Sequence, residues 1–340
     1  MTTSVTIMHC SPSALTSSLA TTVDVPETSA RVSEVHIAIC PTSADFANTQ
    51  RNDPTLGTAD EQIARMLAAA KLVRSPIVRC VQGTAADRSG PIEKHMAETV
   101  RVLKANRSRI LDSGVKLAIE NHAGDMQGRE LRKIIEEAGP DIVGVCLDSG
   151  NPFNANETPH ITLEHLAPYT LTSHMRDSYV FNSPQGIASR WTRMGDGNMG
   201  MEEYIKKYIQ KCPGKAVSLE VIVSANFRVF NYRDPAAWAL FQSTPAWEFA
   251  QLLALADKGV PMDLPPPGQG RGGGAPAGAP NATAAAPTAG GRAAPQGAAG
   301  APAAGGGSGR GAAPNPEAQA RNLADVETSV RWTQGALARV

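Results

Sequence analysis

Short apolar runs alternate with longer amphipathic stretches through most of the chain. Apolar runs typical of strands occupy 35–39, 77–81, 116–120, 142–148, 169–175 and 215–222. Helical spacing of apolar positions occupies 61–73, 92–114, 128–139, 162–166, 201–212 and 234–256, the last broken near Pro245. Strands that alternate with helices in this way indicate βα units around a parallel sheet. Many of the strands are apolar without clean alternation, which fits a sheet covered on both faces.

The two ends of the chain depart from this pattern. Residues 1–34 form a poorly patterned N-terminal segment, in which a short strand pattern at 5–8 precedes a Ser/Thr-rich stretch that makes a poor helix. Residues 261–316 are almost wholly Gly, Ala and Pro. Such a tract cannot bury enough apolar surface to offset the entropy lost on ordering, so we predict a disordered insertion. Residues 317–340 regain helical spacing and are expected to dock as a C-terminal helix on the catalytic domain, residues 35–260.

The length and the absent motifs decide between two parallel-sheet folds. The chain has 340 residues, and without the Gly/Ala/Pro tract its patterned part has the usual size of a (β/α)8 barrel, about 250 residues. No GxGxxG follows the first strand and no GxxxxGK[ST] occurs, so the common nucleotide-binding signatures of doubly wound sheets are absent. We therefore predict an α/β protein, a (β/α)8 TIM barrel whose first βα unit is degenerate or shortened.

The charge balance and the cysteines limit the binding partners and the cellular location that we expect. The 32 basic and 32 acidic residues balance, so neither nucleic acid nor an anionic membrane is an expected partner. No apolar run reaches 18 residues, and the first twenty residues lack a basic and then apolar leader, so we expect neither a membrane span nor a secretory signal. Five scattered cysteines without a CxxC predict reduced, mostly buried thiols and a cytoplasmic location.

Four predicted strands end in a side chain that can bind a metal: Glu120, Asp148, His174 and Glu220. The gaps between them are 28, 26 and 46 residues. Because one barrel unit takes about 25–30 residues, the first two gaps predict one unit each and the third predicts two, on strands four, five, six and eight. The carboxyl ends of barrel strands form the active-site face. Three carboxylates with one imidazole suit Mn²⁺ best, with Mg²⁺, Co²⁺ and Zn²⁺ as alternatives.

Five motifs carry a resemblance to a known family. They are LAIENH at 117–122, VGVCLDSGNPF at 143–153, SHMRDS at 173–178, RMGDGNMGMEEYI at 193–205 and VSLEVI at 217–222. In order and spacing they resemble the xylose isomerase-like TIM-barrel family of sugar phosphate isomerases and epimerases, over residues 35–256. The resemblance implies that Glu120, Asp148, His174 and Glu220 bind a divalent metal. It also implies that Glu120 and Glu220 are the catalytic carboxylates.

The implied activity is a metal-dependent sugar isomerase or epimerase of carbohydrate metabolism. One carboxylate removes a proton next to a carbonyl, the metal stabilises the resulting enediolate, and the second carboxylate returns the proton. The expected partner is a small sugar or keto-sugar, and a homo-oligomer stays open.

Further candidates lie next to the four ligands in sequence. The side chains that could bind substrate are Asn121, His122, Asn151, Arg176 and Trp191. Asp177 could orient a ligand or serve a second metal. Each has a structural alternative: loop orientation for Asn121 and His122, helix capping for Asn151, a salt bridge for Arg176 and Asp177, and packing for Trp191.

Three other functions stay in view. A dehydratase of a keto-sugar or keto-inositol would begin with the same proton abstraction, so the residues do not separate a lyase from an isomerase. A degenerate barrel without catalysis is the non-enzymatic alternative, motivated by the weak first unit and the long insertion. An endonuclease IV-like DNA nuclease is disfavoured, because Asn151 stands where a further histidine ligand is needed and the chain has no basic excess.

Overall fold

The computed structural model describes residues 5–7, 21–22, 35–36, 57–83, 85, 88, 91–264 and 316–340. Most of the predicted N-terminal segment, 1–34, lies outside these residues, as does the predicted disordered insertion from 265 to 315. No helix within the described ranges is long and apolar enough to span a lipid bilayer.

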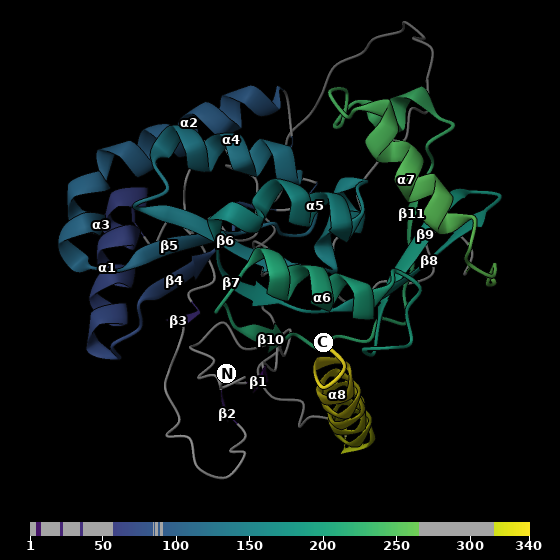
Figure 1. Ribbon diagram of the computed structural model, residues 1–340. Helices are drawn as coiled ribbons and strands as arrows, with labels where there is room; N and C mark the ends of the chain where they lie inside the picture. Colours follow the sequence, from purple (N-terminus) through teal and green to yellow (C-terminus); the bar gives the residue numbers. More distant parts are fainter. Residues whose placement is uncertain are drawn as a thin grey trace, which may run out of the picture.

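A curved parallel sheet forms the centre of the molecule (Figure 1). Its strands are β3 (Val35–His36), β4 (Ile77–Cys80), β5 (Lys116–Glu120), β6 (Val143–Asp148) and β7 (Thr170–His174), paired in that order. A parallel bridge between Met175 and Leu219 adds β10 (Val217–Leu219) beside β7. β1 (Val5–Ile7) pairs in parallel with β10, and β2 (Thr21–Thr22) pairs antiparallel with β1. With its covering helices, this sheet gives the α/β fold of a TIM barrel.

Helices cover the outer side of the sheet. They are α1 (Ala59–Leu72), α2 (Ile92–Ala105), α3 (Arg107–Ser113), α4 (Gly128–Ala138), α5 (Pro159–Leu166) and α6 (Met201–Lys211). In α4, Leu131, Ile134 and Ile135 recur at helical spacing and are completely buried in the core, which explains why this segment is held as a helix. All six residues of β6 are buried, as expected for a strand with both faces covered.

The long helix predicted at 92–114 is divided into α2 and α3 at Asn106. The Asn106 side chain donates a hydrogen bond to the Val102 carbonyl at 3.0 Å and another to Asp60 of α1. These bonds explain the break, because an asparagine side chain that bonds to nearby backbone competes with continuous helix.

A small antiparallel sheet interrupts the barrel between β7 and α6. It contains β8 (Asp177–Ser183), β9 (Gly186–Thr192) and the later β11 (Arg228–Phe230), in the order β11-β9-β8. The hairpin β8–β9 takes up much of the gap between His174 and Glu220. The expectation of two βα units in this gap was wrong: α6 is its one α-helix, and β10 bonds directly to β7.

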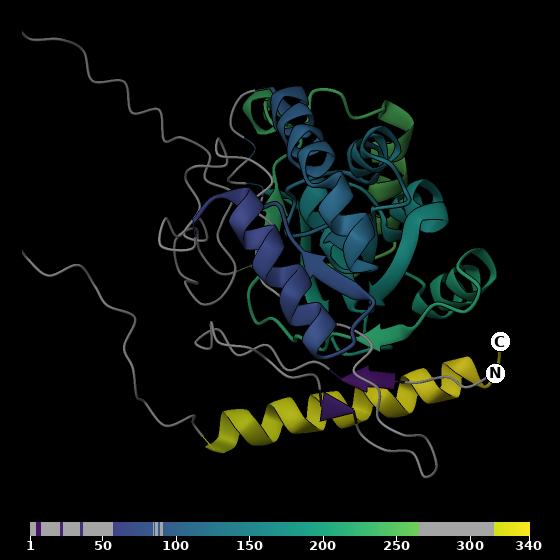
Figure 2. The same cartoon turned by 90° about the vertical axis from the view of Figure 1, so that its left-hand side faces the viewer.

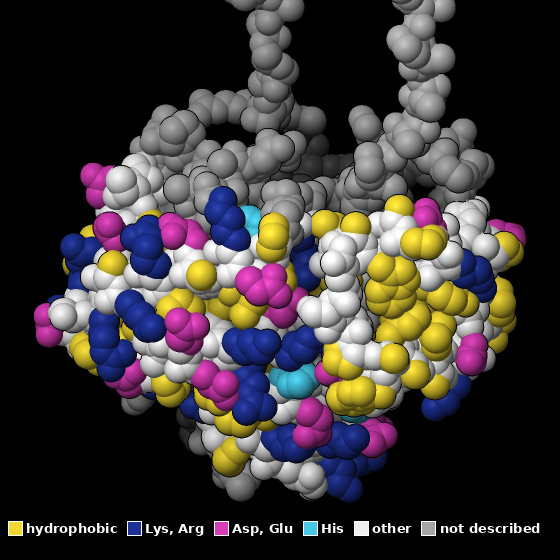
Figure 3. All heavy atoms as spheres, turned by 90° about the horizontal axis from the view of Figure 1, so that it is seen from above, with side chains coloured by type: hydrophobic (Ala, Val, Ile, Leu, Met, Phe, Trp, Pro, Cys, Tyr) yellow, Lys and Arg dark blue, Asp and Glu magenta, His cyan; other side chains and the backbone are white. Residues whose placement is uncertain are grey.

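Short 3-10 helices and two further α-helices complete the described chain. They are η3 (Asn151–Ala155), η4 (Ala167–Tyr169), η5 (Pro235–Trp238), α7 (Ala246–Ala256) and α8 (Pro316–Leu337). α7 packs on β8, and hydrophobic side chains gather on the half of the surface that carries α7, where Trp247 is 59% exposed (Figure 3). Charges of both signs are spread over the half that carries α2 and α4 (Figure 3).

The C-terminal helix α8 runs along the lower edge of the molecule and packs against α6 (Figure 2). Ala336 of α8 is completely buried in the core cluster, and the Ser329 hydroxyl accepts a hydrogen bond from the Met194 N–H at 3.2 Å. At Gly195 a Cβ atom would lie only 2.2 Å from Nε1 of Trp332, so a glycine is required where the helix crosses this turn. Contacts with Ser329 and Trp332 of α8 therefore hold the turn at Met194 and Gly195 in place.

Candidate metal centre

The four predicted ligands stand at the carboxyl ends of four neighbouring strands. Glu120, Asp148 and His174 are the last residues of β5, β6 and β7, and Glu220 directly follows β10. The parallel register pairs Asp148 with His174. All four are buried, and one donor atom from each lies within 4.8 Å of the others. Parallel pairing thus brings residues 100 positions apart in the sequence into one cluster.

Both glutamates approach the same nitrogen of the His174 imidazole. Its Nδ1 is 3.2 Å from Oε2 of Glu220 and 3.6 Å from Oε1 of Glu120. Asp148 is held differently: its Oδ1 accepts hydrogen bonds from the backbone N–H groups of Gly150 and Asn151, both at 2.7 Å. The tight turn after β6 therefore fixes the orientation of this carboxylate.

Two arginines neutralise part of the negative charge. Arg176 donates to Oδ2 of Asp148 from Nε at 2.9 Å and from Nη2 at 2.5 Å, and its Nη2 lies 2.8 Å from Oε2 of Glu220. Arg79 of β4 forms an ion pair with Oε2 of Glu120. The charges of three buried carboxylates are thus partly balanced by the buried Arg176 and the partly buried Arg79, which makes the burial of the carboxylates tolerable.

These contacts shift the pKa values of the carboxyl groups in opposite directions. Burial raises the pKa of Glu120 and Glu220, but Arg79 beside Glu120, Arg176 beside Glu220 and His174 beside both outweigh burial, so both pKa values fall below the usual range. For Asp148, burial and the two neighbouring glutamates outweigh Arg176 and raise the pKa to about 7. Glu120 and Glu220 are therefore ionised at neutral pH.

The donor set fits a divalent cation. Carboxylate oxygens with one imidazole nitrogen are ligands for Mn²⁺, Mg²⁺, Co²⁺ and Zn²⁺. Next to them, Nδ2 of the buried Asn151 donates to Oε1 of Glu120 at 3.0 Å. The Oδ1 atom of Asn151 is buried without a hydrogen-bond partner among the described residues. Asn151 thus touches the cluster and keeps an acceptor for a further group.

Asn121 and His122 form hydrogen bonds to the backbone and side chains of neighbouring segments. The Asn121 side chain bridges to β6, accepting from the Asp148 N–H at 2.9 Å and donating to the Asp148 carbonyl at 2.8 Å. The Nδ1 atom of His122 lies 2.8 Å from the Gly83 carbonyl, and the backbone N–H of His122 donates to the Asp125 carboxylate at 3.0 Å. These contacts match the structural alternative, in which the pair orients the loop after β5.

Trp191 and Asp177 lie on the hairpin. The Trp191 ring stacks on the Arg176 guanidinium at 4.4 Å, and its Nε1 donates to the Gly150 carbonyl at 3.2 Å. It therefore packs against the centre through Arg176. Asp177 instead accepts from the N–H groups of Gly195 at 2.9 Å and Gly197 at 3.2 Å, so its bonds fix that turn rather than one of the four ligands.

Two residues of the centre were missed from the sequence. Arg79 is a charged residue inside the apolar strand IVRC, which is the one signal that could have found it. Cys146 is completely buried, two positions before Asp148 in β6, and forms a second group with Glu120 and His174 whose donor atoms lie within 4.8 Å of one another. The period of two in a strand puts Cys146 and Asp148 on the same face, which is the signal for this thiol.

Cys80, Cys146 and Cys212 are buried. Cys10 and Cys40 lie outside the described residues.

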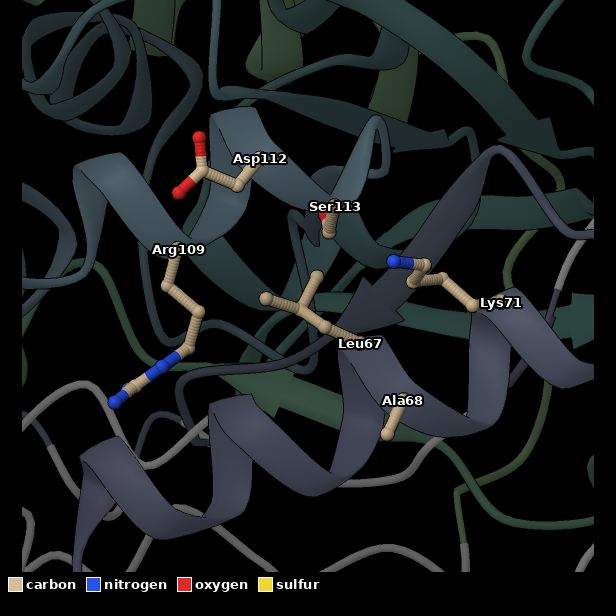
Figure 4. Close-up of a pocket in the computed structure, with 6 residues that line it drawn as sticks. All are labelled: Leu67, Ala68, Lys71, Arg109, Asp112 and Ser113. Carbon is tan, nitrogen blue, oxygen red and sulfur yellow. The ribbon is translucent and has the colours of Figure 1, made fainter.

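A separate surface pocket lies between α1 and α3 (Figure 4). Its lining residues are Leu67, Ala68, Lys71, Arg109, Asp112 and Ser113. None of them belongs to the metal centre, so this pocket adds nothing to the candidate chemistry.

Comparison with known proteins gives a family match and several distant relatives. Residues 24–239 match the family model described as xylose isomerase-like TIM barrel. An uncharacterized protein of Escherichia coli strain K12, YihM, is 30% identical over 93 residues, which cover 27% of this chain and 28% of YihM. The chain thus matches little more than a quarter of the length of that curated relative.

Two solved structures illustrate the structural likeness. A xylose isomerase domain protein from Planctomyces limnophilus is 20% identical with a TM-score of 0.39, covering 48% of this chain and 58% of the other. A xylose isomerase-like TIM barrel protein from Mycobacterium smegmatis, in complex with magnesium, is 14% identical with a TM-score of 0.43, covering 56% of this chain and 67% of the other.

Proposed function

The chain belongs to the xylose isomerase-like TIM-barrel family, and from this premise we propose that it is a divalent-metal-dependent sugar isomerase or epimerase. The observation that carries the proposal is the pair Glu120 and Glu220, two ionised carboxylates that both approach Nδ1 of His174 within one buried cluster. Moving a proton between adjacent carbons, or between the two faces of one carbon, requires such a pair.

The two glutamates have complementary roles in this proposal. In an isomerisation, one ionised carboxylate takes the proton from a carbon next to the substrate carbonyl and returns it to the neighbouring carbon. In an epimerisation, the second glutamate takes a proton from water and delivers it to the other face of the carbon, and the first glutamate then releases its proton to water. Glu120, Asp148, His174 and Glu220 would hold the cation, with Mn²⁺ as the first choice. When bound, a divalent cation supplies a Lewis acid that draws electron density from the carbonyl oxygen.

The charge balance of the centre supports this chemistry. With Asp148 ionised, as a metal ligand would be, three carboxylates and two guanidinium groups leave one net negative charge before His174 is counted. A bound divalent cation would add two positive charges to this count. The centre as a whole would then favour an anion formed from the substrate, as expected of a site that stabilises an enediolate.

We place the substrate among small sugars and keto-sugars of carbohydrate metabolism, and the protein in the cytoplasm, on its scattered, reduced cysteines. The Asn151 Oδ1 atom, which is buried without a partner among the described residues, is the acceptor we assign to a substrate hydroxyl.

A substrate screen tests the proposed function. The metal-stripped protein is reloaded with Mn²⁺ and incubated in D₂O with a panel of ketoses and keto-sugars, with product followed by NMR and mass spectrometry. We expect a new sugar isomer that carries one carbon-bound deuterium. Loss of water would indicate the dehydratase instead. Bound metal without turnover of any compound in the panel would argue for a barrel that does not catalyse this chemistry.

A further inference from the structure

Cys146 lies directly below the four-ligand centre. In the strand pairing it stands opposite Glu120 of β5, and it precedes Asp148 by two residues on the same face of β6. It is completely buried, as are the side chains of Glu120 and His174 around it. One donor atom from each of these three residues lies within 4.8 Å of the others. The thiol therefore shares two of its neighbours with the cation site proposed above.

The distances suit a metal contact from the sulfur. Zinc binds sulfur at about 2.3 Å and imidazole nitrogen at about 2.0–2.1 Å, so one ion between the two donors spans up to about 4.4 Å. The donor atoms of Cys146, Glu120 and His174 are within 4.8 Å of one another. The spacing of the donor atoms is therefore of the size that one shared ion requires.

The other buried cysteines have no such surroundings. Arg79 faces the centre from β4, so its neighbour Cys80 faces the helices on the opposite side of the strand. Cys212 follows α6, and its thiol donates to the Ala167 carbonyl at 3.7 Å. Among the three cysteines that the structure describes, Cys146 alone belongs to a group of metal-binding side chains.

We propose that Cys146 supplies a sulfur ligand to the metal centre and shifts its preference from Mn²⁺ and Mg²⁺ towards Zn²⁺ and Co²⁺. Hard oxygen ligands suit Mg²⁺ and Mn²⁺, whereas a thiolate favours the softer cations. On binding, the S–H bond of Cys146 is replaced by a sulfur–metal bond and the proton passes to solvent, with no change of oxidation state. The inference rests on the proposed metal-dependent function.

Cobalt spectroscopy of the full chain tests the sulfur contact. The metal-stripped protein is titrated with Co²⁺ while the visible ligand-field bands and the near-ultraviolet sulfur-to-cobalt charge-transfer band are recorded. We expect both signals to saturate together. The charge-transfer band should disappear in Cys146→Ser and persist in Cys80→Ser, the matched buried control. Ligand-field bands without a charge-transfer band in the wild type would overturn the proposal, as would a charge-transfer band that survives in Cys146→Ser.

Competition between metals gives a second readout that does not depend on activity. Cys146→Ser should weaken Zn²⁺ binding by about 10- to 100-fold, the scale on which changes around metal ligands act, and should change Mn²⁺ binding much less. Equal weakening for both cations would contradict the proposed selectivity. Cys146→Ala repeats the measurement with an apolar side chain, and the wild-type spectrum decides the question even if both variants fold poorly.

The same titration separates this inference from the proposed function. If Co²⁺ does not bind at all, the metal centre fails and both proposals fall with it. If Co²⁺ binds without a sulfur signal, only the role of Cys146 is lost. If the sulfur signal is present and no sugar in the panel turns over with Mn²⁺, Zn²⁺ or Co²⁺ bound, the metal ligand stands and the proposed reaction is wrong.

Discussion

Exchanging Glu120 or Glu220 for glutamine removes one proton-transferring group while keeping its shape. Glutamine retains an oxygen that can face the cluster, so the packing around His174 and Arg176 is preserved. We expect each single variant, Glu120→Gln and Glu220→Gln, to lose the sugar interconversion. A general acid or base contributes about 10²- to 10⁴-fold in rate, which corresponds to about 3–5 kcal/mol in the activation barrier.

The structure sets a much smaller expected effect on stability. Glu220→Gln removes the charge from a contact with Arg176 at 2.8 Å, and a hydrogen bond to a charged group contributes about 1.5–3 kcal/mol. Arg176 keeps its two bonds to Asp148, and one of three mutually repelling carboxylates is gone. The net loss should therefore stay below about 2 kcal/mol, or about 4–8 °C in melting temperature for a domain of this size.

The assay measures turnover and the exchange of the substrate carbon-bound hydrogen with deuterium, at equal metal content. Glu157→Gln is the matched control, since Glu157 is another buried carboxyl, bonded to Gly128 and Thr162 instead of the centre. For each direction of the reaction, we expect one of the two variants to exchange the carbon-bound hydrogen for deuterium without converting the sugar into its isomer. The control variant should keep wild-type activity. Wild-type turnover in either Glu120→Gln or Glu220→Gln, with metal bound, would refute the two-carboxylate reasoning.

Four further changes test other parts of the structure. Burial raises the pKa of Glu157 to about 8, so between about pH 4.5 and 8 the folded protein holds this proton and the unfolded chain does not. Stability is therefore lost as pH rises through this window. The gain in free energy of unfolding from Glu157→Gln, measured by urea unfolding, should grow from about pH 5 to pH 9, and a gain that does not change with pH would contradict the raised pKa. Trp191→Ala removes the stacking on Arg176 at 4.4 Å, about 0.5–2 kcal/mol, and should raise KM or lower kcat severalfold, while Trp191→Phe retains most activity. Ala336→Glu places a charge at a completely buried position of α8 and should lower the melting temperature by several degrees, without changing the kcat of the folded fraction; an unchanged melting temperature would show that α8 does not pack in solution. Removal of bound metal by a chelator should lower the melting temperature by about 5–11 °C, since saturation at 100 times Kd stabilises by about 2.7 kcal/mol, and a transition independent of metal would contradict the centre.

The fold and the four-ligand cluster could be predicted because both follow from strand periodicity and spacing. Glu120, Asp148 and His174 each end an apolar run, and consecutive runs lie one βα unit apart. Parallel neighbours then share one edge of the sheet, where their last side chains meet. The third gap misled the strand count, because a β-hairpin and a helical unit occupy the same length of chain.

Contacts between elements could not be predicted in this way. The Arg79 side chain reaches Glu120 because Arg79 pairs with Ala118 in the register of β4 and β5, and the apolar pattern of IVRC does not encode that register. Asn121 turns back onto Asp148 because the strand ends are close enough for two hydrogen bonds across the sheet. Both contacts follow from tertiary geometry. From the sequence alone, Asn121 was predicted to bind substrate and Arg79 was not singled out.

The two arginines also decide how folding depends on the cation. Burying three carboxylates in one cluster without counter-charges would cost several kcal/mol for each ion, and a protein built that way would need its metal to fold. Here Arg79 pairs with Glu120, and Arg176 bridges Asp148 and Glu220. Arg176 pairs with Oδ2 of Asp148 and Oε2 of Glu220, two carboxylates that would also hold the cation. The arginine would therefore compete with the cation for these carboxylates while it supports the fold. Chelation should then shift the melting temperature rather than unfold the protein, in contrast to small domains that fold only around zinc.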